Sequence, residues 1–250
     1  MKDKNKGCEL VVKTNSLIMA IQKLTISETR LMQLAIIEAR TNGSLDHGMP
    51  IYIHAETYAN TFNTTTENGY KALLEAETRL FERRFQFISE RGNPVKSRWV
   101  TSVEYIKGEY TLKIKLSDDL INEVTKIDGY KQFFTSYRLE QTSQLKSAYS
   151  IRLFELLIQN IKIGKVSFDL EVFRLQLGIN PDEYSLMSNF KKFVLDSSVN
   201  EINDKTDLKI SYEQHKKGRK IVGFTFTIKS KEHDTLKRQK VSIGVAIELA

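Results

Sequence analysis

Residues 184–228 read YSLMSNFKKFVLDSSVNEINDKTDLKISYEQHKKGRKIVGFTFTI, the most informative stretch of the chain. It contains a helix-like segment (SNFKKFVLDSSVNEIN), a strand (ISYE), a basic tip (QHKKGRK) and a second strand (IVGFTFTI). The strands are rich in β-branched and aromatic residues, and the tip between them contains one glycine. The stretch therefore predicts a helix that leads directly into a hairpin with a cationic tip.

The predicted tip carries four cations within five positions: Lys216, Lys217, Arg219 and Lys220. Charged residues also protect edge hairpins from aggregation, but fewer would suffice for that task. Residues 205–231 hold 8 basic and 2 acidic residues, whereas the chain is nearly balanced across residues 1–139 (20 basic, 17 acidic) and 140–250 (18 and 14). A focused positive field of this kind favours contact with the phosphates or the minor groove of DNA.

The predicted helix has polar residues where a helix in the major groove makes base contacts, near its N-terminal part. These candidate DNA-binding residues are Ser188, Asn189, Lys191 and Lys192. We expect Phe190, Phe193 and Val194 to form the apolar face, which leaves both lysines on the solvent side. The alternative is a pair of lysines on an ordinary solvated face, and the adjacent basic hairpin favours DNA. Together the helix and hairpin predict a winged-helix domain.

The far end of this helix is less regular. Beyond Val194 the apolar stripe changes phase to Leu195, Val199 and Ile202. Residues 198–201 (SVNE) also resemble a capping box, the pairing of a hydroxyl and a carboxylate that starts a helix. The pattern predicts that the helix bends or restarts near Asp196.

The first half of the chain repeats the order of the second half. Residues 51–88 and 166–213 both run through a short strand, a short helix, a polar turn, a longer helix and a strand. In the first half we expect a helix from Ser27, begun by a capping box at residues 25–28, and strands at 85–88 and 99–106 around the RGNP turn. The fold class is therefore α+β, with two tandem winged helices related by pseudo-duplication.

The domains are expected at residues 1–135 and 136–230, joined near residues 133–140, with an unassigned tail at 231–250. The long helix of the first domain mixes Lys71, Arg79, Arg83 and Arg84 with Glu75, Glu77 and Glu82. Mixed charge is more typical of a solvated face or a protein interface than of a phosphate-binding track. We expect this domain to serve in dimerisation and auxiliary DNA contact, with less base reading.

Composition restricts the function further. The chain has 250 residues, 40% hydrophobic and 28% charged, with a formal net charge of +7 that favours a polyanionic partner. Cys8 is the only cysteine, so an intrachain disulfide is impossible. No run of 18 apolar residues exists, and the N-terminus lacks the apolar core of a signal peptide. We expect a cytoplasmic protein without a membrane partner.

Motifs of catalysis are missing from the sequence. It contains no G-x-x-x-x-G-K-[ST] nucleotide-binding motif. The four histidines have no paired metal-ligand spacing, as a rolling-circle nickase would require. Asp118 and Asp119 fit a helix start better than a nuclease carboxylate pair. No enzyme activity, catalytic residue, metal or cofactor is expected.

The chain resembles the iteron-binding plasmid replication initiators from about Val12 to Lys229. The resemblance is carried by TNSLIMA with LTISETRLMQLAI, then SAYSIRLFELL, FRLQLGI, NFKKFVLDSSVNEIN and TDLKISYEQHKKGRKIVGFTF. By this resemblance Lys191 and Lys192 match the basic pair of the recognition helix, and the cations of the tip match the wing. Family members usually have a proline where this chain has Ser197, and often a basic residue where it has Phe193. Because of these two differences, we expect the base preference and the bend of the helix to differ from those of other family members.

The resemblance implies a binding protein that reads double-stranded origin repeats (iterons) through its C-terminal domain. Monomers of the family open the adjacent A+T-rich DNA and recruit the host initiator and the replicative helicase, in some cases with chaperones. Dimers, formed mainly through the N-terminal domain, typically repress the protein's own gene. The alternatives left open are a dimeric winged-helix transcriptional repressor without initiator activity, a DNA-nicking enzyme, and a scaffolding role of the first domain.

Overall fold

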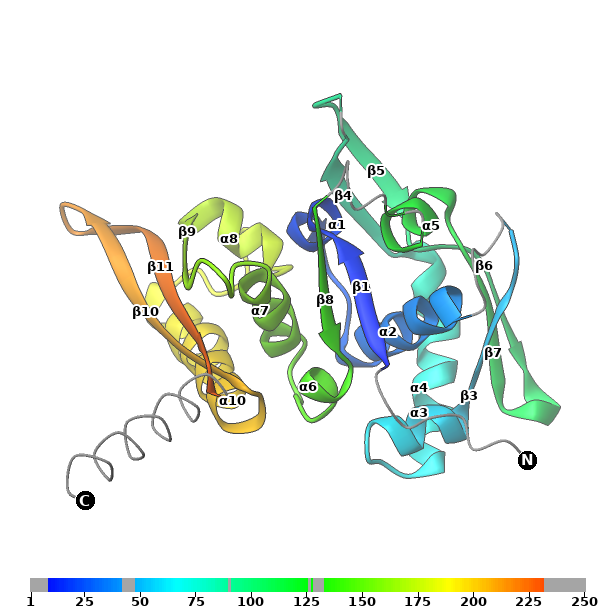
Figure 1. Cartoon of the computed structure of the whole chain (residues 1–250). Helices are drawn as coiled ribbons and strands as arrows, with labels where there is room; N and C mark the ends of the chain where they lie inside the picture. Colours follow the sequence, from blue (N-terminus) through cyan, green and yellow to red (C-terminus); the bar gives the residue numbers. More distant parts are fainter. Residues whose placement is uncertain (1–8, 42–47, 90, 126, 128–132, 232–250) are drawn as a thin grey trace, which may run out of the picture.

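The computed structural model describes residues 9–41, 48–89, 91–125, 127 and 133–231, and Figure 1 shows two units, each of helices and a sheet, on either side of a central strand pair. One continuous hydrophobic core runs through both units and contains Leu31, Leu73, Leu156 and Phe224. Cys8, His47, His233 and the predicted tail from residue 232 onward lie outside the described residues.

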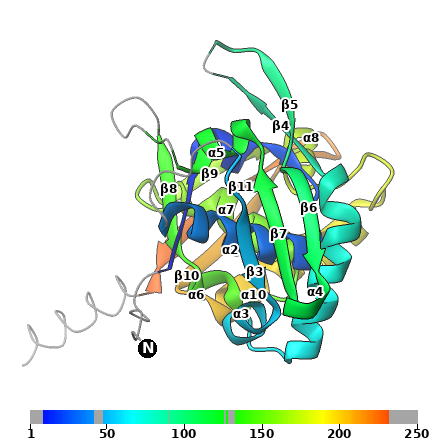
Figure 2. The ribbon, with the colours of Figure 1, turned by 90° about the vertical axis from the view of Figure 1, so that its right-hand side faces the viewer.

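The first unit is a winged helix built on the three-stranded sheet β3-β7-β6. Figure 2 shows these strands side by side, with α4 next to β6 and α2 behind the sheet. Its elements are α2 (Ile26–Thr41), β3 (Ile51–His54), α3 (Ala55–Thr61), α4 (Thr66–Arg79), β6 (Val100–Ile106) and β7 (Thr111–Leu116). Ile51, Ile53, Leu112 and Ile114 are buried at alternating positions of the sheet, which is the period that a half-buried strand requires.

The second unit repeats this order around the sheet β10-β11-β9. Its elements are α7 (Ala148–Ile158), β9 (Lys165–Asp169), α8 (Leu170–Gln176), α9 (Met187–Asn189), a π-helical stretch (Phe190–Asp196), α10 (Ser197–Lys205), β10 (Leu208–Lys217) and β11 (Lys220–Ser230). In each unit the first strand pairs antiparallel with the last one, β3 with β7 and β9 with β11. The α+β class and the pseudo-duplicated pair of winged helices are thus confirmed.

The strands expected at 85–88 and 99–106 are both present, but a further strand that the sequence did not predict lies between them. β4 (Arg84–Ile88) pairs with β5 (Pro94–Arg98), and β6 pairs instead with β7 in another sheet. The β4–β5 hairpin projects at the top of Figure 1 and joins β2 (Ile21–Gln22) in a third sheet. This hairpin is inserted between α4 and β6. The strands of the first unit that correspond to β10 and β11 are therefore β6 and β7.

A strand pair between the units has no counterpart in the sequence-based expectation. β1 (Leu10–Thr14) and β8 (Phe134–Arg138) pair antiparallel, with Val12 opposite Ser136. β8 therefore occupies most of the segment expected to be the linker. The remaining short helices are α1 (Asn15–Met19), α5 (Asp118–Val124) and α6 (Glu140–Ser143). The expected helix start at Asp118 is confirmed, because the Ser117 hydroxyl caps α5 by accepting a hydrogen bond from the Leu120 amide.

The capping box at the start of α2 is formed as expected. The Thr25 amide donates to Glu28 Oε2 at 2.7 Å, and the Glu28 amide donates to Thr25 Oγ1 at 3.3 Å. These bonds satisfy two amides that have no partner within the helix. Glu28 also accepts a 2.8 Å hydrogen bond from Arg83 Nε, which ties the start of α2 to the residue just before β4.

A buried ionic cluster fixes the second unit against β1 and β8. Glu155 of α7 accepts hydrogen bonds from Lys13 Nζ at 2.6 Å and from the Tyr137 hydroxyl at 2.6 Å, and lies 3.4 Å from Arg152 Nη1. Arg152 also donates to the carbonyl of Ala20 at 2.6 Å. Burial by itself would raise the pKa of Glu155, but the attraction of Lys13 and Arg152 outweighs it and holds that pKa below its usual value. The cluster therefore holds the two units together through charges that depend on one another.

Candidate nucleic-acid interface

The helix that was expected to bend or restart near Asp196 does not restart there but continues through this residue. Asn189, Phe190, Asp196 and Ser197 all have right-handed helical dihedral angles. Between them the helix is π-helical, with about one residue more per turn than an α-helix. This extra residue produces the phase change that the sequence shows beyond Val194. The buried stripe consists of Phe190, Val194, Leu195, Ser198, Val199 and Ile202.

The second capping box, expected at residues 198–201, is not formed. Ser198 lies inside the helix and is 2% exposed, so its hydroxyl is not at a helix start. Glu201 accepts a 2.7 Å hydrogen bond from the Lys146 amide, just before α7. The apparent motif instead joins two helices of the second unit.

Phe193 does not belong to the apolar face, contrary to the expectation. Its side chain is 54% exposed, while Phe190 and Val194 are buried. In an α-helix, residues 190, 193 and 194 would share a face, but in a π-helical stretch the shared positions are i, i+4 and i+5. Phe193 is therefore turned outward. It joins the exposed residues Ser188, Asn189 and Lys192 on the outer side of the helix.

The two lysines of this helix have different surroundings. Lys192 is exposed, with Nζ 5.1 Å from the centre of the Phe193 ring. Lys191 is half-buried, contrary to the expectation, with Nζ 3.4 Å from Gln214 Oε1 and 5.8 Å from the centre of the Tyr212 ring. Because Tyr212 and Gln214 belong to β10, the Lys191 ammonium lies at the junction of helix and hairpin.

Tyr212 of β10 makes a second contact between the helix and the hairpin. Its hydroxyl donates a hydrogen bond to Asp196, and its ring packs at 5.5 Å from Phe224. Burial and, second, the hydrogen bond to the Asp196 carboxylate raise the pKa of Tyr212, so it stays a neutral donor. Helix and hairpin are therefore held in a fixed relation.

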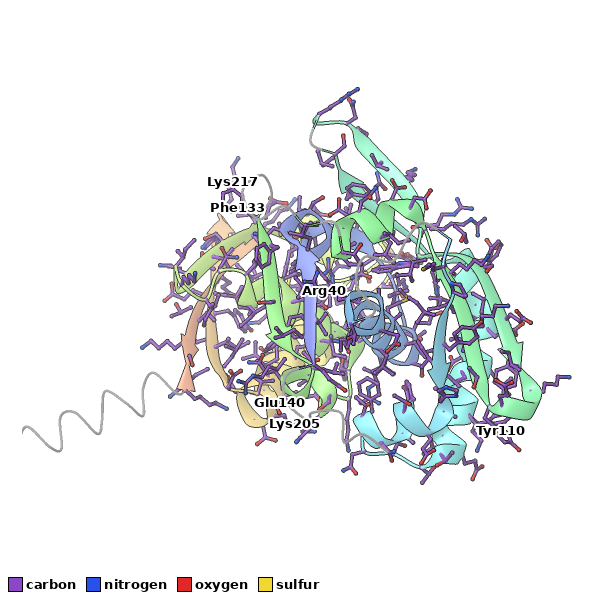
Figure 3. All side chains as sticks on the ribbon, turned by 45° about the vertical axis from the view of Figure 1, so that its right-hand side comes forward. Arg40, Tyr110, Phe133, Glu140, Lys205 and Lys217 are labelled. Carbon is purple, nitrogen blue, oxygen red and sulfur yellow. The ribbon has the colours of Figure 1, made fainter. Side chains whose placement is uncertain are left out.

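The hairpin has the cationic tip that the sequence predicts. Gly218 and Arg219 form the two-residue turn between the paired Lys217 and Lys220. Gly218 has a φ of +63°, which a glycine adopts without strain at the first position of such turns. All four cations of the tip are exposed, and Figure 3 shows Lys217 extending away from the molecule.

None of the six cations predicted to contact DNA has an acidic partner among the described residues: Lys191, Lys192, Lys216, Lys217, Arg219 and Lys220. The hairpin tip of the first unit, by contrast, contains Lys107 and Glu109, and Lys71 and Arg79 of α4 pair with Glu67 and Glu75. Figure 3 places the two tips, marked by Tyr110 and Lys217, at opposite ends of the molecule. Among the described residues, the helix and hairpin of the second unit thus present a cluster of six cations without acidic partners, whereas the two cations of α4 are paired. We name this surface the helix–wing surface: Ser188, Asn189, Lys191, Lys192, Phe193, Lys216, Lys217, Arg219 and Lys220.

Within the described ranges, no group of three His, Cys, Asp or Glu side chains is arranged to hold a metal ion. No helix in the described part of the chain is both long and apolar enough to span a membrane.

Sequence reasoning missed one residue of this surface, Phe193. The signal was present as apolar spacings of four and five residues (190, 194, 195, 199), which indicate a π-helical insertion.

Comparisons with known proteins agree with the two units. A family model described as "Initiator Replication protein, WH1" matches residues 10–158, and one described as "Initiator Rep protein, WH2" matches residues 169–228. The first match includes α7, which the predicted boundary at residues 135 and 136 assigns to the second domain. That boundary remains a prediction.

Individual relatives are distant in sequence. A replication initiation protein of Escherichia coli is 22% identical in an alignment 223 residues long that covers 84% of this chain and 67% of that protein. The crystal structure of the Pi initiator protein in complex with iteron DNA is 21% identical, with a TM-score of 0.74 over 90% of this chain and 98% of that one. The WH1 domain of MSBI1.176, a replication protein isolated from a multiple sclerosis patient, is 35% identical over 40% of this chain and 79% of that chain, with a TM-score of 0.34.

Proposed function

Because the chain belongs to the family of initiator replication proteins with WH1 and WH2 domains, we propose that it initiates plasmid replication by binding repeated duplex sites (iterons) at the origin. The observation that carries this proposal is the helix–wing surface of WH2, whose six cations lack acidic partners among the described residues. Phosphates would supply the missing counter-charges and release condensed cations from the DNA. The Pi initiator, whose fold this chain shares, was crystallised with iteron DNA.

The two parts of the surface divide the task. The outer side of the recognition helix enters the major groove, where Ser188, Asn189 and Lys192 contact base edges. The wing places its cations over the phosphates, which sets register and affinity without reading sequence. Lys191, held at the junction by Gln214 and Tyr212, bridges the two parts.

The later steps rest on family membership. We propose that bound monomers, with the help of chaperones, open the adjacent A+T-rich DNA and recruit the host initiator and helicase, and that dimers repress the gene. Self-association through WH1 is supported by two adjacent exposed rings at the start of β8, Phe133 and Phe134, which are 87% and 48% exposed. The protein acts by binding, with no catalytic step and no cofactor. Its expected compartment, the cytoplasm, stays a prediction.

Gel shifts on the direct repeats beside the gene test the binding step. The Lys191→Ala/Lys192→Ala variant should lose preference for the repeats over a scrambled duplex, because it loses contacts on the helix. The Lys216→Ala/Lys217→Ala variant should weaken binding to both duplexes alike. Unchanged binding by both variants would remove the helix–wing surface from the account.

Initiation is separated from repression by a plasmid that carries the gene and its upstream repeats as its sole origin. Replication in a suitable host supports the initiator. Failure to replicate, together with repression of a reporter by the same repeats, would establish the repressor instead. A nick or covalent adduct on supercoiled origin DNA with Mg²⁺ or Mn²⁺ would overturn binding without catalysis.

A further inference from the structure

We propose that Phe193 is a specificity-determining residue that contacts the C5-methyl group of a thymine in the site bound by WH2. This inference rests on the proposed function and deepens it. Phe193 is 54% exposed on the helix–wing surface, where its neighbours Ser188, Asn189 and Lys192 are polar and exposed. A phenylalanine there presents one apolar patch within a polar, cationic surface.

The placement is imposed by the course of the backbone. The π-helical stretch moves the buried stripe from Phe190 to Val194 and Leu195, so residue 193 cannot return to the core. An exposed apolar side chain by itself needs no functional explanation. This one, however, lies one position from Lys192 and one helical turn beyond Asn189, on the side that faces the base edges if WH2 binds as proposed.

The major groove offers a matching partner. Among the four bases only thymine presents an apolar group there, its C5-methyl, and phenylalanine is one of the side chains that contact it. Lys192 Nζ lies 5.1 Å from the centre of the Phe193 ring, so the ammonium stays beside the aromatic patch. Phe193 would therefore contact the thymine methyl, while Lys192 donates to an acceptor on a neighbouring base or phosphate. Asn189 remains free to bond to a base edge.

The test removes the methyl group without altering base pairing. The wild-type full-length protein first selects its preferred duplex from a randomised library, and each thymine of that duplex is then replaced singly by deoxyuridine. At one thymine of the half of the site contacted by WH2, the affinity should fall about fourfold, the effect of burying one methyl-sized group. Phe193→Ala should bind the unmodified duplex correspondingly more weakly, and should show no further loss with deoxyuridine at that position.

The matched control is Phe81→Ala in WH1. Phe81 is 41% exposed and also stacks with a cation, Arg98, at 4.8 Å. This variant should keep the wild-type response to deoxyuridine.

The outcomes separate the two proposals. If the wild-type protein selects a sequence but no deoxyuridine substitution changes its affinity by twofold, the role of Phe193 is refuted while specific binding stands. The same holds if Phe193→Ala keeps the full response to deoxyuridine. If the wild-type protein selects no sequence at all, the proposed function itself fails. The wild-type measurements need no variant to fold.

Discussion

WH1 and WH2 have the same order of elements, but the cations on their corresponding helices differ in whether they are paired with acidic residues. In WH1, Lys71 lies 2.7 Å from Glu67, and Arg79 lies 3.2 Å from Glu75, each pair one helical turn apart on α4. In WH2, Lys192 and the wing cations have no acidic partner among the described residues. The same fold thus presents a helix and a hairpin in both units, with different charge on each. We expect the cluster of unpaired cations on the helix and wing of WH2 to make it the copy that holds DNA.

The two helices differ in regularity as well. α4 begins at a Thr65 cap and is α-helical from Thr66 to Arg79. The corresponding helix of WH2 contains seven π-helical residues in its middle. π-Helical segments are rare in proteins, and many of those that occur lie at functional sites. Here the insertion turns Phe193 outward onto the helix–wing surface.

The largest effect is expected where the two units are joined, because the comparison presumes that they fold as one body. Glu155→Ala should lower the free energy of unfolding by about 3–5 kcal/mol, since it leaves Lys13 and Arg152 buried without a counter-charge. Urea denaturation measures the loss. Glu67→Ala removes an exposed carboxylate of WH1 and should leave the urea midpoint close to wild type. Equal, small effects of both substitutions would show that the buried cluster does not join the units.

The same carboxylate predicts a pH dependence. The pKa of Glu155 is lowered in the folded protein, so its contribution to stability is present above its unfolded pKa, about 4.3, and is lost as the pH falls through the folded value. Urea midpoints measured downward from pH 6 should decline less steeply for Glu155→Gln than for wild type. Parallel curves would contradict the assignment.

The wing gives the next largest effect. Each phosphate-binding lysine contributes about one unit to the slope of log affinity against log salt concentration, so Lys216→Ala/Lys217→Ala should reduce that slope by about two. Fluorescence anisotropy with a labelled duplex measures it. The matched WH1 variant, Lys71→Ala/Arg79→Ala, should keep the wild-type slope because its cations are already paired. A reduced slope for the WH1 variant as well would break the contrast between the units.

The recognition helix should have a smaller, sequence-dependent effect. Lys192→Ala should cost about 1–3 kcal/mol of discrimination between the origin repeat and a duplex altered at one base pair. Competition gel shifts measure it against Arg79→Ala, which should retain full discrimination. If Lys192→Ala weakens every duplex equally, Lys192 contacts phosphate and does not read bases.

The smallest effect tests whether pairing alone silences WH1. Glu67→Gln/Glu75→Gln should release Lys71 and Arg79 and increase affinity for a non-specific duplex, with a slope steeper by at most about two units. Affinity at low salt measures the gain. No gain would mean that α4 faces away from bound DNA. Its position, and not the pairing of its cations, would then explain why WH1 contributes less to DNA binding than WH2.

Local sequence signals predicted most of the elements but not all of their partners. The Thr25–Glu28 capping box, the α5 start and the cationic hairpin depend on neighbouring residues, and all three are confirmed. The partner of β4 was missed because strand pairing depends on the surrounding fold. Phe85 of β4 packs against Trp99, just before β6, but β4 and β6 do not pair with each other. β1 and β8 were missed because more than a hundred residues separate them, and each is too short to stand out.

The sequence predicted most residues of the helix–wing surface, but it did not predict how all of their side chains are placed. The cations of the wing follow directly from a local excess of charge, so their exposure could be expected. The outward turn of Phe193 could not, because it depends on a π-helical insertion whose only sign is a change of apolar spacing. Nor could the half-burial of Lys191, since it requires Tyr212 and Gln214 of β10 to meet the helix.

Ultraviolet cross-linking of the full-length protein to the origin repeat, followed by mass spectrometry of the cross-linked peptides, tests the contrast between WH1 and WH2 most directly. The account predicts that cross-links concentrate in residues 188–193 and 214–221. Cross-links concentrated instead in α4 and at the tip of the β6–β7 hairpin would contradict it.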